Sequence, residues 1–111
     1  MGFRYVYYQP MVSLAARDAA GQSNAFKVVS YNEGILFVKV TAKAGTLPNL
    51  KVLVEVSPNN SDWYQASESN FDAEGNFSLE VDNFVSYIRA RWEISGTNPS
   101  FTFSIDGQFK S

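Results

Sequence analysis

The stretch NLKVLVEVS, residues Asn49–Ser57, carries the pattern that decides the fold class. Every second residue of this stretch is apolar: Leu50, Val52, Val54 and Val56. Successive side chains of a β-strand point to opposite faces, so a period of two predicts a strand with one buried face. Because half-buried strands of this kind are typical of antiparallel sheets, the stretch indicates an antiparallel fold.

The same alternation recurs along the chain. It is clearest in Asn76–Asp82, Val85–Ser95 and Ser100–Gln108. On the buried faces it places Phe77, Trp92, Phe101 and Phe103, which we expect in the core. Ile35–Ala42 starts with apolar residues on both faces, which suits a central strand or a strand covered by a neighbour. Weaker strand signals occur at Phe26–Tyr31 and Trp63–Phe71.

The alanine-rich stretch Met11–Ala20 is open to two interpretations, a short helix or a strand followed by a loop. Because its neighbours are strand-like, we favour a strand at Met11–Ala16. Gly, Asn and Pro turn signals separate the apolar runs at regular spacing. The sequence therefore predicts an all-β protein, an antiparallel two-sheet β-sandwich of about seven to nine strands, jelly-roll or immunoglobulin-like. One sandwich domain is expected over residues 11–111, preceded at residues 1–10 by an aromatic arm or a first strand.

One short motif occurs twice. Gly45-Thr46-Leu47-Pro48 and Gly96-Thr97-Asn98-Pro99 share the pattern G-T-x-P, and each is followed by an alternating strand. Gly and Pro are strong turn formers. We therefore interpret the motif as a hairpin connection used in both sheets.

The composition narrows the chemistry that is open to the protein. The 111 residues include no histidine and no cysteine, which excludes imidazole bases, cysteine nucleophiles, disulfides and metal–thiolate sites. Asp72 and Glu74 flank a glycine turn that only faintly resembles a calcium loop, and a solvated hairpin tip is the simpler interpretation. We expect a protein that is not an enzyme and holds no cofactor or metal.

Charge and hydropathy bear on the partners. The net charge of −2 argues against nucleic acid, whose binding proteins usually carry a basic patch. No apolar run approaches the ~20 residues needed to span a bilayer, so no membrane partner is expected.

The first residues are unusually aromatic. The candidate interface residues here are Phe3, Arg4, Tyr5, Tyr7 and Tyr8. Both faces of a strand through this segment would be apolar, as in an arm that adds to a neighbour's sheet edge or packs between subunits. Residues 1–9 are therefore an assembly arm or, alternatively, a first strand buried in its own sandwich and ended by Pro10.

Two further groups are candidate binding residues. Tyr87, Arg89 and Arg91 share one polar strand face, which predicts either an interface stripe or a solvated face with cross-strand pairs. Trp63 and Tyr64 follow a tight turn and could stack on a sugar ring, as in a carbohydrate-binding module. In the alternative interpretation, Trp63 covers the open end of the sandwich.

Two motifs are specific enough to compare with known families. One is S-P-x-x-x-x-W-Y at Ser57–Tyr64, and the other is R-x-R-W…S-G-T-x-P-S-F-T-F-S at Arg89–Ser104. Together with Val40–Pro48, they resemble a family of small β-sandwich proteins encoded among the virion structural genes of tailed bacteriophages and prophages. The resemblance extends from Val12 to Lys110. The usual turn of that family is S-P-D-G-T-x-W, and this chain has Asn59-Asn60-Ser61 in its place.

The resemblance implies a virion accessory role, such as capsid decoration or stabilisation, without catalysis. The expected partners are other copies of the chain, in a homo-oligomer, and the major capsid protein. The expected location is the virion, assembled in the cytoplasm of the bacterial host. A tail or neck component and a module that recognises host-surface glycans are the alternatives.

Overall fold

The computed structural model describes residues 6–82 and 86–111. The regular secondary structure in these ranges consists of β-strands alone. The strands are β1 (Val6–Arg17), β2 (Gly21–Gln22), β3 (Phe26–Lys27), β4 (Glu33–Ser57), β5 (Tyr64–Phe71), β6 (Gly75–Asp82) and β7 (Tyr87–Lys110). All pairings between them are antiparallel. The predicted all-β antiparallel fold is confirmed.

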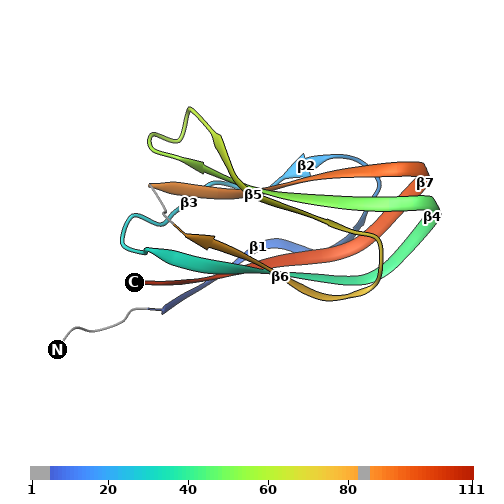
Figure 1. Cartoon of the computed structure of the whole chain (residues 1–111), viewed down its shortest axis with the longest axis horizontal. Helices are drawn as coiled ribbons and strands as arrows, with labels where there is room; N and C mark the ends of the chain where they lie inside the picture. Colours follow the sequence, from blue (N-terminus) through green and yellow to red (C-terminus); the bar gives the residue numbers. More distant parts are fainter. Residues whose placement is uncertain (1–5, 83–85) are drawn as a thin grey trace.

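The long strands β4 and β7, of 25 and 24 residues, pair along most of their length and run through both layers of the molecule (Figure 1). Residues 33–44 of β4 and 100–110 of β7 form one layer with β1 and β6, which we call the β6 layer. Residues 49–57 and 87–95 form the other with β2, β3 and β5, the β5 layer. The sandwich is thus one hydrogen-bonded sheet folded over on itself.

The G-T-x-P motifs form the fold line of this sheet. The sequence predicts hairpin connections at these motifs, and that prediction is wrong. Both motifs lie within continuous strands, and Thr46 pairs with Thr97. Each motif has the same backbone: the glycine has a positive φ (105° at Gly45, 124° at Gly96), and so does the third residue. Such a glycine turn would end an isolated strand. Here β4 and β7 bend side by side at their two motifs, so the hydrogen-bonded ladder between them continues from one layer into the other.

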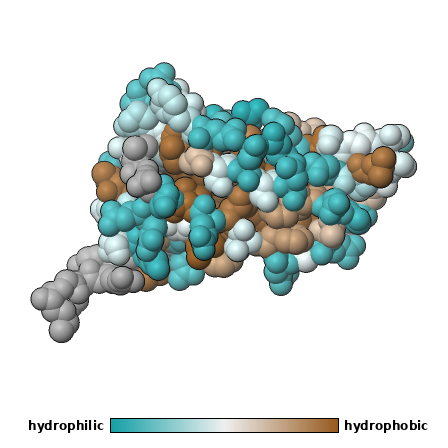
Figure 2. Space-filling view, viewed as in Figure 1, coloured by the Kyte–Doolittle hydropathy of each residue, from teal (hydrophilic) through white to brown (hydrophobic). Residues whose placement is uncertain are grey.

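The third residue of the motif differs between the copies. Leu47 (φ 50°) and Asn98 (φ 49°) both have left-handed backbones, but only asparagine is well suited to that region. Leu47 is 88% exposed, so its side chain gains almost nothing from packing. Figure 2 shows a hydrophobic patch at the right-hand end of the molecule, where β4 and β7 bend.

Replacing Leu47 with asparagine is therefore expected to stabilise the protein. Leu47→Asn should raise the free energy of unfolding by about 0.5–1 kcal/mol. Asparagine tolerates the left-handed backbone better than leucine, and the exposed Leu47 side chain loses almost no buried area when it is replaced. Thermal unfolding should show a midpoint about 3–6 °C higher. The reciprocal change Asn98→Leu should lower the midpoint by a similar amount, and equal midpoints for both variants would contradict this explanation.

The core lies between the two layers and contains the expected aromatic residues. Phe101 and Phe103 are fully buried, and Trp92 meets the Phe103 ring edge-on at 5.5 Å between centroids. The Trp92 indole N–H donates to the Ala19 carbonyl at 3.0 Å, so the buried polar atom is satisfied. Phe77, also expected inside, is half-buried and stacks on Phe71 at 4.6 Å.

The N-terminal part of the described chain is a strand throughout. β1 pairs with β7 from Val6, opposite Lys110, to Arg17, opposite Phe101, with register shifts on either side of Val12. The strand interpretation of residues 11–16 is therefore correct and the helical one is wrong.

Candidate interaction surface

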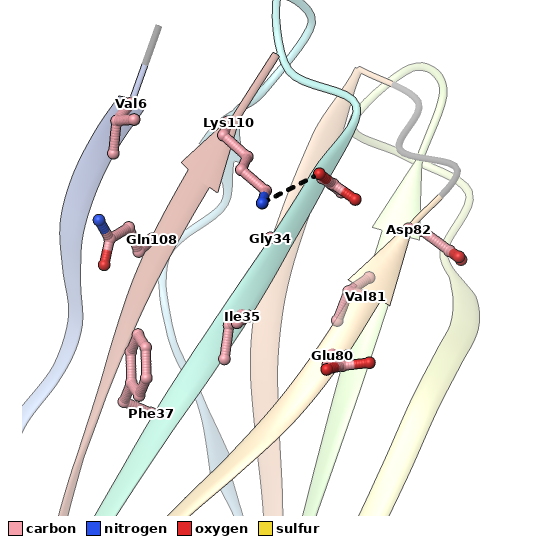
Figure 3. A pocket seen from close by; sticks show the side chains of 10 residues that line it. Val6, Gly34, Ile35, Phe37, Glu80, Val81, Asp82, Gln108 and Lys110 are labelled. Atoms are coloured by element: carbon pink, nitrogen blue, oxygen red, sulfur yellow. Dashed lines mark ion pairs between the residues drawn. The ribbon is translucent and has the colours of Figure 1, made fainter. Parts of the chain in front are cut away.

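A groove crosses the outer face of the β6 layer near the C-terminal end of β7 (Figure 3). Its volume is about 570 Å³, and it is lined from all four strands of the layer by Val6, Glu33, Gly34, Ile35, Phe37, Glu80, Val81, Asp82, Gln108 and Lys110. The groove arises because side chains of alternate residues on β4, β6 and β7 project outward in register, with Ile35 opposite both Glu80 and Gln108.

The groove combines exposed apolar side chains with an acidic wall. Val6 is 60% and Phe37 is 42% exposed. Glu80 and Asp82 project from β6 along one side of the groove (Figure 3). At its end, Lys110 and Glu33 form an ion pair of 3.3 Å between half-exposed side chains. An exposed apolar patch with a charged border is typical of a protein–protein contact.

Tyr8 extends this apolar surface along β1. It is 57% exposed and lies opposite Gln108 in the β1–β7 ladder. A hydrogen bond to the Asp106 carboxylate raises the pKa of Tyr8, because the acceptor is charged and favours the protonated phenol.

The candidate residues of the N-terminal segment do not share one surface. Tyr7 is half-buried and stacks on Tyr31 and Phe109, with centroid distances of 5.7 and 6.3 Å. Tyr8 points to the opposite, outer face. The remaining candidates, Phe3, Arg4 and Tyr5, lie outside the described residues. Of the described pair, only Tyr8 offers a large exposed surface to a partner.

The predicted arginine stripe lies on the outer face of the β5 layer and is held by a carboxylate from the neighbouring strand. Glu55 accepts from Arg89 Nε at 2.8 Å and from Arg91 at 3.4 Å, and Arg91 also donates to Glu93 at 3.1 Å. The Glu55 and Arg89 side chains are only 10% and 18% exposed. Arg91, at 41%, is the more accessible cation. Tyr87, at the start of the same strand, is half-buried.

Trp63 and Tyr64 lie on different sides of the sheet. The Trp63 ring packs under the Arg89 guanidinium, 4.1 Å from its centroid, on the outer face. Tyr64 pairs with Val56, whose side chain packs against the core, and Tyr64 is 61% exposed at the sheet edge. The two rings therefore do not form a joint platform for a sugar.

Apart from Val6, which lies in the predicted arm, none of the lining residues was singled out from the sequence as a binding residue, although Ile35 and Phe37 carried a signal. The signal was the two-sided apolar start of this stretch, which suggested a covered strand. In the structure, Leu36 and Val38 are buried, whereas Phe37 is exposed on the other face. The second apolar face of the strand is thus the open surface of the groove.

In residues 6–82 and 86–111, the structure contains no group of three or more acidic side chains placed to hold a metal ion. These residues also include no helix that could span a bilayer.

No protein-family model and no curated protein matches the sequence. Solved structures with the same fold include the PBSX exported protein XepA, with a TM-score of 0.68 and 17% identity over 97% of this chain. The SPBc2 prophage-derived protein YomS matches with a TM-score of 0.62 and 10% identity over the whole chain and 97% of YomS. VP2 of the infectious bursal disease virus subviral particle has a TM-score of 0.62 and 9% identity over 96% of this chain. The chain spans 37% of XepA and 32% of VP2. At these identities, the likeness shows a shared fold.

Proposed function

We propose that this chain is a non-enzymatic structural protein of a bacteriophage particle, a capsid decoration or stabilising subunit that acts through subunit–subunit contacts. The observation that carries the proposal is the groove of the β6 layer, with Val6, Ile35 and Phe37 on an exposed sheet face. The fold shared with two prophage proteins and a viral VP2 supports the setting. Its partners are other copies of the chain and the major capsid protein.

The protein would act by stabilising contacts between subunits, without a chemical reaction. Contacts that bury the groove in an assembled particle remove apolar surface from water, which raises the free energy needed to separate neighbouring subunits. Compared with this role, glycan recognition has less support, because Arg89 already covers one face of the Trp63 ring.

The direct test is to locate the protein in purified particles. Quantitative mass spectrometry is expected to find it in a fixed ratio to the major capsid protein, and cryo-electron microscopy should place it on the capsid surface. Its absence from intact particles would overturn the structural role. A tail or neck position would overturn the decoration role alone.

A surface variant tests whether the groove makes these contacts. Phe37→Thr keeps a strand-forming residue but removes the largest exposed apolar side chain of the groove, and it should weaken binding to particles at least about tenfold. Co-sedimentation of the purified protein with particles that lack it measures this affinity. Tyr64→Thr, an equivalent change at an exposed residue of the other layer, is the control and should bind normally. Equal losses in both variants, or none, would contradict a role for the groove.

A further inference from the structure

We propose, building on the structural role above, that residues 1–5 of one subunit bind as an added strand in a neighbouring copy of the chain, along the edge of β6 that no described strand occupies. The proposal deepens the assembly role by naming the donor segment and the acceptor edge.

β6 is the most regular edge that the described strands leave open. It pairs with β4 at eight consecutive positions without a register shift, and no described strand pairs with its other side. The other edges are interrupted or short. β1 contains Pro10 and two register shifts, the ladder of β5 has one shift, and β2 and β3 have two residues each. A regular edge without a proline or bulge is the kind that accepts another strand.

The side of the molecule that carries β6 exposes part of the interior. Figure 2 shows hydrophobic side chains along the middle of this side, between the hydrophilic groups of the two layers. Phe77, on the inner face of β6, is only half-buried there. An added strand with large apolar side chains on its inner face would cover this strip.

The alternation of residues 1–5 matches both faces of β6. On β6, Leu79 and Val81 point into the core and Glu80 points outward. A strand that places Arg4 opposite Glu80 places Phe3 and Tyr5 opposite the two apolar residues. Among the described residues, Glu80 has no ion-pair partner within 4.0 Å. The cation of the arm therefore meets the acidic wall of the groove, and its aromatic rings meet the core.

The distance across the layer indicates a second copy as the donor. The strand order is β1–β7–β4–β6, so Val6 starts three strand spacings, or about 14 Å, from β6. Five extended residues span at most about 17 Å. If residues 1–5 crossed the layer to β6 of their own chain, almost none of them would remain to pair with it. The segment also contains no turn-forming residue between Phe3 and Val6 that would reverse its direction. Since donor and acceptor lie at opposite edges, the contact is head-to-tail. It builds a ring where the rotation between neighbouring subunits closes and an open filament where it does not.

Engineered disulfides test this placement cleanly, because the natural chain has no cysteine. Arg4→Cys mixed with Glu80→Cys under mild oxidation should give a disulfide-linked dimer on a non-reducing gel. The matched control pairs Arg4→Cys with Glu74→Cys, an exposed acidic position in the turn before β6, and should cross-link at least fivefold less. The double variant Arg4→Cys/Glu80→Cys should form linked oligomers.

The outcomes separate this inference from the structural role. A monomeric intrachain disulfide in the double variant, no cross-link in the mixture, or equal cross-linking with Glu74→Cys would each overturn the strand exchange. If the protein is nevertheless found in purified particles, the structural role stands without the exchange. If the cross-link forms but particles lack the protein, the exchange stands and the virion role fails.

Discussion

Replacement of Gly45 or Gly96 by alanine is expected to lower the free energy of unfolding by about 3–5 kcal/mol. A Cβ at Gly45 would lie 2.6 Å from the Asn98 carbonyl oxygen, and one at Gly96 would lie 2.8 Å from that of Leu47. Both glycines also have φ values of 105° and 124°, which L-residues rarely adopt. Each glycine therefore makes room for the backbone of the other motif.

Urea unfolding followed by circular dichroism measures this loss, and both variants should show a much lower midpoint. Thr46→Ala, a change between the two positive-φ residues of the same bend, is the control and should cost less than about 1 kcal/mol. If either glycine variant unfolds like Thr46→Ala, the close approach of the two motifs does not limit the fold.

Removal of the Glu55 carboxylate is expected to have the second largest effect. Glu55→Ala should cost about 2–3 kcal/mol, because it leaves the largely buried Arg89, which lies over the Trp63 ring, without its counter-charge. The carboxylate is one-tenth exposed and accepts from two arginines, so solvent replaces little of what is lost.

The control for this change is an exposed ion pair in the same layer. Lys51 and Glu68 lie 3.0 Å apart, with side chains 34% and 42% exposed, so Glu68→Ala should cost only about 0.5 kcal/mol. Chemical denaturation of both variants gives the comparison. A loss of similar size at both positions would show that burial of the Glu55 site does not strengthen its ion pairs.

The buried faces of the strands could be predicted from the sequence, whereas the continuity of the two long strands could not. The period of two correctly assigned Leu50, Val52, Val54 and Trp92 to the core, because side-chain direction in a strand depends only on position parity. The G-T-x-P motifs suggested breaks between strands, because Gly and Pro usually end them. Only the pairing of Thr46 with Thr97 shows that both motifs bend continuous strands.

The charged residues were recognised individually but not as a network. The outward faces of Arg89, Arg91 and Glu55 followed from alternation alone. Their meeting depends on the register that sets Glu55 opposite Arg89, 34 positions away in the sequence. Nothing local to either strand specifies that register.

The alternating sequence is enough to establish that this chain is an antiparallel β-protein and which face of most strands is buried, because both follow from the direction of neighbouring side chains. Only the folded chain reveals that two long strands are shared by both layers, that Ile35 and Phe37 line an open groove, and that β6 has a regular edge with which no described strand pairs. These features depend on hydrogen bonds and packing between residues far apart in the chain, which set register and strand order and which no local pattern encodes.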